Sequence, residues 1–147
     1  MKTPDLPAED TSPGTRLVRA YLRHEEWSVN TFGPDKGPVG PLKHLVKEAE
    51  EAIEDPQDLS EYVDCQMLIW DAMRRAGFTL VEFIAAIEEK QKLLNVRKYE
   101  RTPEGEPSFH VKEDAPAMDV IEACERTKRR WRDEPRPAFT RNPWDQA

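Results

Sequence analysis

The sequence contains only two cysteines, Cys65 and Cys124, and they lie far apart in the chain. They fit neither the spacing of a zinc site nor a disulfide framework. Cys65 falls within an apolar helical pattern, so it is interpreted as a small core residue. Because nothing suggests structural disulfides, we expect the protein in the reducing environment of a cytoplasm.

The chain also lacks any apolar run of membrane-spanning length, and its amino-terminal residues are acidic and contain proline. We therefore expect no membrane association. Charged residues make up 35% of the 147 residues, and the net charge is -7. Phosphate backbones repel such a chain, so no stable binding of nucleic acid is expected. A small polyanion can still bind where metal ions lie between carboxylates and phosphates.

Proline is absent from residues 57–102 but frequent on either side of that stretch. Between the proline-containing breaks the apolar spacing is helical, and no alternating β pattern is found. The sequence predicts helices at about 15–30, 40–54, 58–76, 79–99 and, more weakly, 117–132. Asp58 and Thr79 are the expected N-caps, Gly77 is the expected stop of the third helix, and residues 100–116 form a loop or strap.

The predicted fold class is therefore all-α, a helical bundle of four to five helices. We expect a loose leader over residues 1–13, a helical domain over 14–132 and a proline-containing tail over 133–147. The third helix is apolar on most of its sides, which predicts that it is buried and central.

Four acidic residues are the candidates for the chemistry of the chain: Glu48, Glu51, Glu61 and Asp64. Each pair is three residues apart, so its members lie on one helix face. The connection around Pro56 is short, so the second and third helices are expected to pack antiparallel and to bring the two pairs together. Crowded carboxylates repel each other unless a cation binds them, and Mg²⁺ prefers oxygen ligands. The competing interpretation is a pair of solvated helix faces, and spacing alone leaves both open.

The stretch HLVKEAEEAIEDPQDLSEYVDCQMLIWDAMRRAGFTL resembles the MazG-like all-α nucleoside triphosphate pyrophosphohydrolases, whose hallmark is Glu-x-x-Glu followed by Glu-x-x-Asp. The flanking stretches TFGP, EKQKLLNVRKY and GEPSFHVKE are similar to the phage and prophage (MazZ-like) branch described as dATP/dGTP diphosphohydrolases. The chain departs from that branch in the position of Asn95 and in Tyr99, where a tryptophan is common. A phage-encoded protein would work in the host cytoplasm.

The resemblance implies a Mg²⁺-dependent enzyme, with Mn²⁺ as a substitute, that cleaves dGTP or dATP to the monophosphate and pyrophosphate. It implies that Glu48, Glu51, Glu61 and Asp64 are the catalytic metal ligands. Lys90 and Arg97 would supply positive charge near the phosphates, with Asn95 close by; a solvated basic stripe is the alternative. Relatives are dimers or tetramers, so a homodimer or homotetramer is expected.

Four further residues are candidates for substrate contact. Trp27 is interpreted as a core residue at a helix end and Asn30 as an ordinary cap, although an indole can stack on a purine and an amide can bind its edge. His44 lies one turn before Glu48 and can support it or touch phosphate, although a lone histidine on a helix is more often structural. Asp71 either extends the site or pairs with Arg75. His24 and His110 have no ligand cluster around them in the sequence.

The basic segment 126–132 is interpreted as a solvated helix end or docking strap rather than a nucleic-acid contact. Two other function classes stay open at this point. One is a non-catalytic helical interaction or regulatory protein, and the other is a related all-α hydrolase acting on pyrimidine triphosphates.

Overall fold

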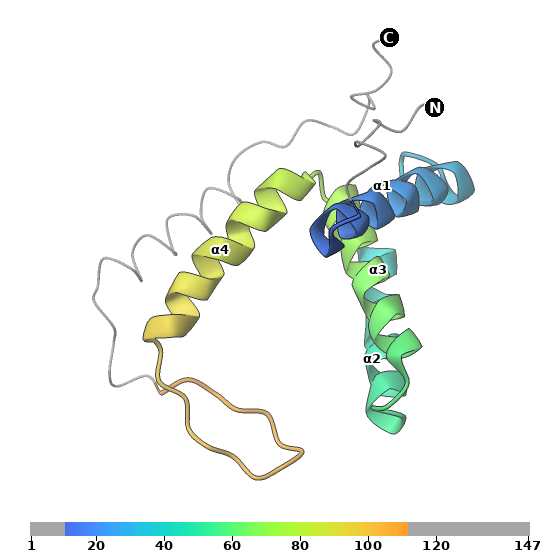
Figure 1. Ribbon diagram of the computed structural model, residues 1–147. Helices are drawn as coiled ribbons and strands as arrows, with labels where there is room; N and C mark the ends of the chain where they lie inside the picture. The colour runs from blue at the N-terminus through green and yellow to red at the C-terminus, as the bar shows by residue number, and fades with distance from the viewer. Residues whose placement is uncertain (1–10, 112–147) are drawn as a thin grey trace. The chain divides into compact units, whose positions relative to one another are not determined.

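The computed structural model describes residues 11–111, and this part of the chain is all-α (Figure 1). It contains α1 (Pro13–Phe32), α2 (Val39–Glu54), α3 (Leu59–Arg75) and α4 (Leu80–Val96). The predicted fold class and the four stronger helices are confirmed. The predicted fifth helix, the basic segment 126–132, the tail 133–147 and most of the leader lie outside the described residues.

The described residues fall into two compact units, which are considered separately. Residues 11–79 hold α1, α2 and α3. Residues 80–111 hold α4 and the segment that follows it. Within residues 11–111, no helix is both long enough and apolar enough to cross a membrane.

Both ends of α1 are formed by residues suited to helix termini. Ser12 is the N-cap, and its Oγ accepts a hydrogen bond from the Thr15 amide at 3.3 Å. Pro13 follows in the first turn, where its missing N–H costs nothing. Gly33 ends the helix with a φ of 88°, a conformation that glycine adopts without strain. The helix is two residues longer at each end than the sequence predicts.

A tight turn joins α2 to α3, so the two helices run side by side in opposite directions (Figure 1). The Asp58 amide donates to the Asp55 carbonyl at 3.1 Å, and the Tyr62 hydroxyl donates to the Pro56 carbonyl at 3.1 Å. Asp58 is the N-cap of α3, as predicted, because its carboxylate accepts from the Ser60 amide at 2.8 Å. This turn sets the register between the two acidic helices.

The carboxyl end of α3 closes in a Schellman motif at Gly77. The Gly77 amide donates to the Arg74 carbonyl at 2.9 Å, and the Phe78 amide donates to the Met73 carbonyl at 3.1 Å. Gly77 has a φ of 87°, which explains why glycine stands at this position. The predicted stop of the helix is confirmed.

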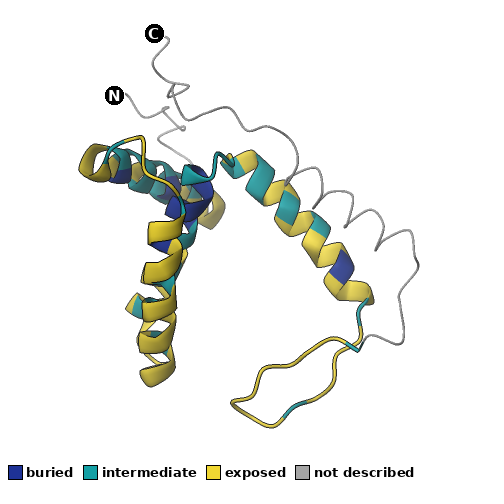
Figure 2. Cartoon of the chain, turned by 180° about the vertical axis from the view of Figure 1, so that it is seen from behind, coloured by how far each residue is buried: buried dark blue, intermediate teal, exposed yellow. Residues whose placement is uncertain are grey.

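The core of the first unit lies where α1 crosses the second half of α3 (Figure 2). Tyr21 and Trp70 meet edge to face with ring centroids 5.6 Å apart, and Ala72 and Met73 are buried nearby in the sequence. The first half of α3 is different, since Leu59 is 74% exposed and Tyr62 and Val63 are also exposed. The prediction that the whole helix is buried is therefore wrong for this half, and Cys65 is only half-buried.

A buried polar network ties α1 to α3 within this core. The Ser28 hydroxyl donates to Asp71 at 2.8 Å, and Arg74 and Arg75 contact the two oxygens of the same carboxylate at 3.3 and 3.0 Å. Ser28, Asp71 and Arg74 are all buried. One carboxylate thus contacts two guanidinium groups, and the charge of Glu25 also acts on Arg74, so the junction depends on these charges electrostatically.

His24 lies beside this network, with its Nε2 atom 3.6 Å from Asp71. Burial lowers the pKa of His24; the charge of Asp71 opposes this, and those of Arg74 and Arg75 add to it. The folded protein therefore binds this proton less readily than the unfolded chain, in which the pKa is about 6.5. Stability is expected to fall as the pH drops through that value.

The measurement is urea unfolding at pH 7.5 and 5.5. The His24→Gln variant is expected to lose less stability between the two pH values than the wild type. His110→Gln replaces an exposed histidine and controls for the substitution itself. An equal loss in the wild type and His24→Gln would show that this imidazole does not contribute.

The second unit contains α4 and a strap that folds back on itself. The helix ends at Val96, three residues before the predicted end, because the chain then enters an antiparallel bridge between Tyr99 and His110. The Val111 amide donates to the Lys98 carbonyl at 2.9 Å, and the hydroxyls of Thr102 and Ser108 are 2.8 Å apart. The predicted strap is confirmed over residues 100–111.

Candidate metal centre

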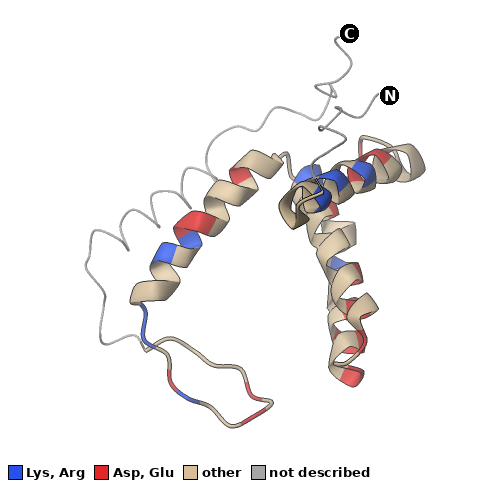
Figure 3. Cartoon of the chain, in the orientation of Figure 1, with Lys and Arg blue, Asp and Glu red and all other residues tan. Residues whose placement is uncertain are grey.

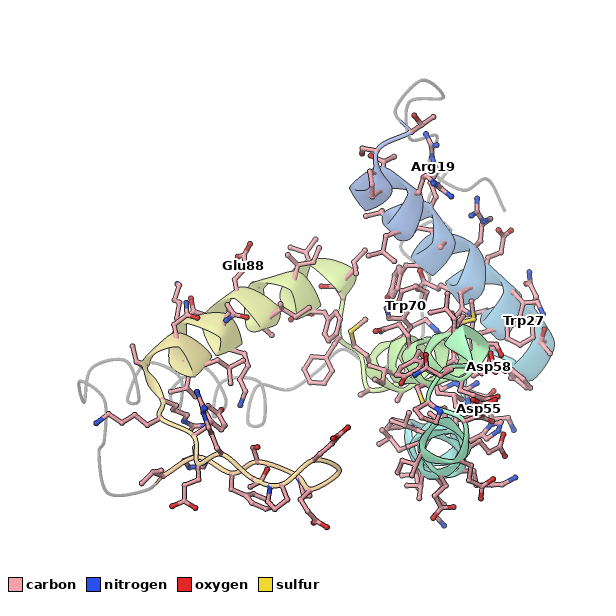
Figure 4. The ribbon with its side chains drawn as sticks, turned by 60° about the horizontal axis from the view of Figure 1, so that its bottom comes forward. Arg19, Trp27, Asp55, Asp58, Trp70 and Glu88 are labelled. Atoms are coloured by element: carbon pink, nitrogen blue, oxygen red, sulfur yellow. The ribbon has the colours of Figure 1, made fainter. Side chains whose placement is uncertain are left out.

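Three carboxylates from two helices converge beside the turn between α2 and α3. One oxygen each of Glu48, Glu51 and Glu61 lies within 4.8 Å of the others. Glu48 and Glu51 are three residues apart on α2, and Glu61 is in the first turn of α3. The antiparallel pairing brings these positions together, as predicted. In Figure 4, Asp55 and Asp58 mark the adjoining turn.

Within this cluster, Glu61 is the carboxyl group whose pKa is clearly shifted. Partial removal from water raises the pKa of its carboxyl, and the negative charges of Glu51, Asp58, Glu48 and Asp64 raise it further. Its Oε2 atom is shielded from solvent and has no hydrogen-bond partner within the described residues. A shielded carboxylate oxygen among like charges is unfavourable by itself, and a bound cation would remove the penalty.

The donor set of this cluster fits a hard divalent cation. All three groups are carboxylates, the ligand type that Mg²⁺ and Mn²⁺ favour. No lysine or arginine of the described residues forms an ion pair with any of them. The cluster therefore has no lysine or arginine counter-charge within the described residues, and three carboxylates share the single basic contact made by His44.

His44 contacts the cluster from one turn earlier on α2. Its Nε2 atom is 2.7 Å from Oε1 of Glu48. The Glu48 side chain is 13% exposed, whereas that of His44 is 55% exposed. His44 therefore contacts Glu48, and both its role in supporting a metal ligand and its contact with phosphate stay predictions.

Asp64 does not join the three converging oxygens. It is exposed and lies one turn beyond Glu61 on α3, close enough for its charge to act on that residue. An aspartate side chain is one methylene shorter than a glutamate, which reduces its reach across the helix pair. Its role as a fourth ligand stays a prediction. Asp58, which lies three residues before Glu61, is an acidic neighbour that the sequence interpretation did not include.

Trp27 is not a core residue, contrary to the favoured interpretation. It is 53% exposed and forms part of an aromatic surface at the end of α1 (Figure 4). Its ring meets Phe32 edge to face at 5.5 Å and His24 at 5.5 Å, and the Arg75 guanidinium lies 5.4 Å from the centre of the Phe32 ring. Asn30 is exposed on the same helix and does not cap it, because the helix continues to Phe32.

Asp71 forms the predicted pair with Arg75, at 3.0 Å. Both of its oxygens are occupied by Ser28 and the two arginines, and the residue is buried. These contacts favour a structural role over a contact with substrate. The sequence interpretation missed Ser28, Arg74 and His24, although the i, i+3 and i, i+4 spacings of Arg74 and Arg75 from Asp71 were visible.

The remaining predicted residues belong to the second unit. Lys90 is exposed on α4, and Asn95 accepts a hydrogen bond from Gln91 at 2.9 Å. Arg97 directly follows the helix and is half-buried, with its amide donating to the Leu93 carbonyl at 3.1 Å. Their contact with phosphates stays a prediction.

Comparison with known proteins accords with this geometry. Residues 20–117, well over half of the chain, match the family model described as dATP/dGTP pyrophosphohydrolase. The chain belongs to the dATP/dGTP pyrophosphohydrolase family. The three converging glutamates lie inside the matched region, as do all of α2, α3 and α4.

A relative of this family member is the Eaa protein of Salmonella phage P22, which is 44% identical over 119 residues. The match covers 81% of the present chain but only 37% of the phage protein. The chain thus spans little more than a third of the length of this curated relative. No solved structure matches the chain.

Proposed function

We propose that this chain is a Mg²⁺-dependent pyrophosphohydrolase that converts dGTP or dATP to the monophosphate and pyrophosphate. The observation that carries the proposal is the convergence of Glu48, Glu51 and Glu61, and the shielded, unpartnered Oε2 of Glu61 supports it. Family membership supports the reaction class and the purine substrates. Mn²⁺ is a chemically reasonable substitute because it accepts the same oxygen ligands.

The three glutamates would hold the cation, with Asp64 as a further ligand. When bound, it supplies charge neutralisation for the triphosphate and lowers the pKa of a coordinated water. Within the chain, the contact at 2.7 Å from His44 holds Glu48 in place against the repulsion of its neighbours. Water attacks the α-phosphorus, the bond to the oxygen that bridges the α- and β-phosphates breaks, and pyrophosphate leaves with that oxygen.

The aromatic surface of Trp27 is our candidate for the purine base. An exposed indole braced by Phe32 and His24 offers a flat face for stacking, and Asn30 lies one turn further along α1. Lys90 and Arg97 would contribute positive charge to the phosphates. The order of preference between guanine and adenine would depend on contacts that Trp27 and Asn30 make with the base.

Self-association is part of the same proposal. The first half of α3 and the adjoining part of α2 expose large apolar side chains, among them Ile53 and Leu59 at 77% and 74%. Burial of these residues in a homodimer or homotetramer would complete the core around the acidic helices. The cellular role would be control of the nucleotide pool. In a phage this includes supply of dGMP or removal of dATP for DNA that contains 2-aminoadenine.

The test is release of pyrophosphate from the four deoxynucleotides and the four ribonucleotides, with Mg²⁺ and with EDTA. We expect turnover of dGTP or dATP with Mg²⁺, no turnover in EDTA, and recovery when Mn²⁺ is added. The physical reason is that the converging glutamates repel a triphosphate unless a cation lies between them.

Two outcomes would contradict the proposal. Preference for dUTP or dCTP would place the chain among hydrolases of pyrimidine triphosphates. Absence of pyrophosphate release from every nucleotide, with protein shown to be folded by circular dichroism, would favour a non-catalytic interaction protein.

A further inference from the structure

The aromatic surface at the end of α1 is supported by an arginine of α3. Trp27 and Phe32 are 53% and 46% exposed, and their rings meet edge to face at 5.5 Å. The guanidinium carbon of Arg75 lies over the Phe32 ring, 5.4 Å from its centre. Both helices belong to the first compact unit, so this contact lies within one body. The exposed rings are thus joined to a side chain that is only 9% exposed.

The guanidinium group of Arg75 is itself held in place by the α1–α3 junction. Its Nη2 atom donates to Oδ2 of Asp71 at 3.0 Å and contacts the Ser28 hydroxyl at 3.5 Å. Asp71 and Ser28 are both buried. A guanidinium is planar, so polar contacts along its edge leave its flat face for an aromatic ring. The position of the cation at Phe32 is therefore set by buried residues.

Phe32 is a residue that needs such support, because it is the last residue of α1. Gly33 ends the helix directly after it, and the ends of helices fray. The half-exposed Phe32 side chain has open space in which other rotamers can form. A cation over an aromatic face is attractive, and the attraction is larger when the cation is shielded from water. Arg75 therefore favours one position of the Phe32 ring.

The position of Phe32 in turn limits the indole of Trp27. On α1 the indole has a second aromatic neighbour, the His24 ring, at 5.5 Å with an angle of 32° between the planes. An indole with neighbours five residues later and three residues earlier has less freedom to rotate than an isolated surface tryptophan. Ordering a side chain before the ligand arrives lowers the entropic cost of binding.

We propose that Arg75 is a positioning residue for the purine base, which acts through Phe32 to hold the Trp27 indole ready for stacking. This inference rests on the proposed contact between Trp27 and the base. Arg75 is too shielded to bind the nucleotide itself. The three converging glutamates lie on α2 and in the first turn of α3, so the effect is on affinity rather than on the chemical step.

The experiment is a titration of the ¹⁵N-labelled full chain with dGMP and with dAMP, in the presence of Mg²⁺. These monophosphates keep the base and have no bond for the enzyme to cleave. The indole N–H resonance of Trp27, assigned with Trp27→Phe, reports binding at the aromatic surface. We expect Arg75→Met and Phe32→Leu each to weaken binding of the preferred monophosphate by about threefold to tenfold. Methionine keeps the unbranched stem of arginine, and leucine keeps an apolar side chain.

A double-mutant cycle tests whether Arg75 acts through Phe32. The double variant Arg75→Met, Phe32→Leu is expected to bind no more weakly than Phe32→Leu alone. Additive losses would overturn the proposal, because Arg75 would then act by another route. Unchanged affinity in Phe32→Leu would overturn it as well. Phe32 is exposed, so this outcome is accessible even if Arg75→Met, which loses the pair with Asp71, does not fold.

The matched control is Arg16→Met, in the first half of α1, where basic residues predominate (Figure 3). Arg16 is exposed and lies eleven residues before Trp27, so the substitution removes the same charge far from the rings. It is expected to bind the monophosphate as the wild type does. A loss equal to that of Arg75→Met would reduce the effect to net charge and overturn the positioning role.

Kinetics separate this inference from the proposed reaction. In pyrophosphate release with Mg²⁺, Phe32→Leu is expected to raise KM several-fold and to keep kcat within about twofold. A loss of kcat with unchanged KM would overturn the inference. A wild type that releases pyrophosphate but whose Trp27 resonance does not respond to nucleotide would overturn it and leave the reaction standing. A wild type without pyrophosphate release would contradict the reaction and leave the titration result intact.

Discussion

Substitution of Glu48 by glutamine is expected to reduce turnover of dGTP or dATP by at least about 100-fold. Glutamine keeps the size of the side chain but removes the negative charge that a divalent cation requires. The variant also replaces the partner of His44, which contacts Glu48 at 2.7 Å. Turnover is measured as pyrophosphate release, and metal affinity as binding of Mn²⁺ by calorimetry.

The matched control for this variant is Glu50→Gln, on the same helix. Glu50 is exposed and does not belong to the group of converging oxygens. We expect Glu50→Gln to retain turnover and Mn²⁺ affinity within about twofold, because a solvated carboxylate contributes little at a distance. If Glu48→Gln binds Mn²⁺ and turns over like Glu50→Gln, Glu48 is not a ligand.

Substitution of Asp71 by asparagine is expected to lower the free energy of unfolding by about 3–5 kcal/mol. Asparagine fills the same space, but it leaves Arg74 and Arg75 at the α1–α3 junction without their shared counter-charge. Arg74 is 2% exposed, so solvent cannot replace the lost carboxylate. Urea unfolding in EDTA at pH 7.5 measures the loss.

Asp35→Asn, at an exposed position in the loop after α1, is the control and is expected to change stability by less than about 0.5 kcal/mol. Asp71 lies ten residues beyond Glu61 on α3, about 15 Å along the helix axis. Turnover per folded molecule is therefore expected to survive in Asp71→Asn under conditions where the variant is folded. A stable Asp71→Asn variant with impaired turnover would instead indicate that Asp71 contacts the substrate. This is the alternative that the sequence left open.

The limits of the helices were predicted from sequence signals that act locally. Asp58 and Gly77 lie where a cap and a left-handed residue are needed, and each acts through hydrogen bonds within a few residues. The acidic cluster was one of two interpretations that the spacing left open, although a short turn leaves two helices few ways to pair; three of its four expected members converge. The end of α4 was wrongly predicted because the bridge between Tyr99 and His110 joins residues eleven apart, and helical periodicity carries no information on such pairing.

The burial of individual residues depends on which faces of the helices contact each other. Periodicity made the third helix apolar on most sides, but only its second half is covered by α1, so its first half stays exposed. Trp27 was expected inside and lies at the surface, because the neighbouring Ser28, on a different face of α1, is the residue that contacts α3. Asp71 is buried and Asp64 is exposed because α1 covers Asp71 and does not cover Asp64.

The sequence by itself determined the all-α class and the limits of α2 and α3 to within one residue, because turn length and helical phase are local properties. It also singled out Glu48, Glu51 and Glu61, but their convergence was decided by the structure. Only the tertiary structure decided that Asp71 is an internal counter-ion, that Trp27 is exposed and that three rather than four carboxylate oxygens converge. These outcomes depend on the distance and angle between helices, which side chains from separate parts of the chain set together.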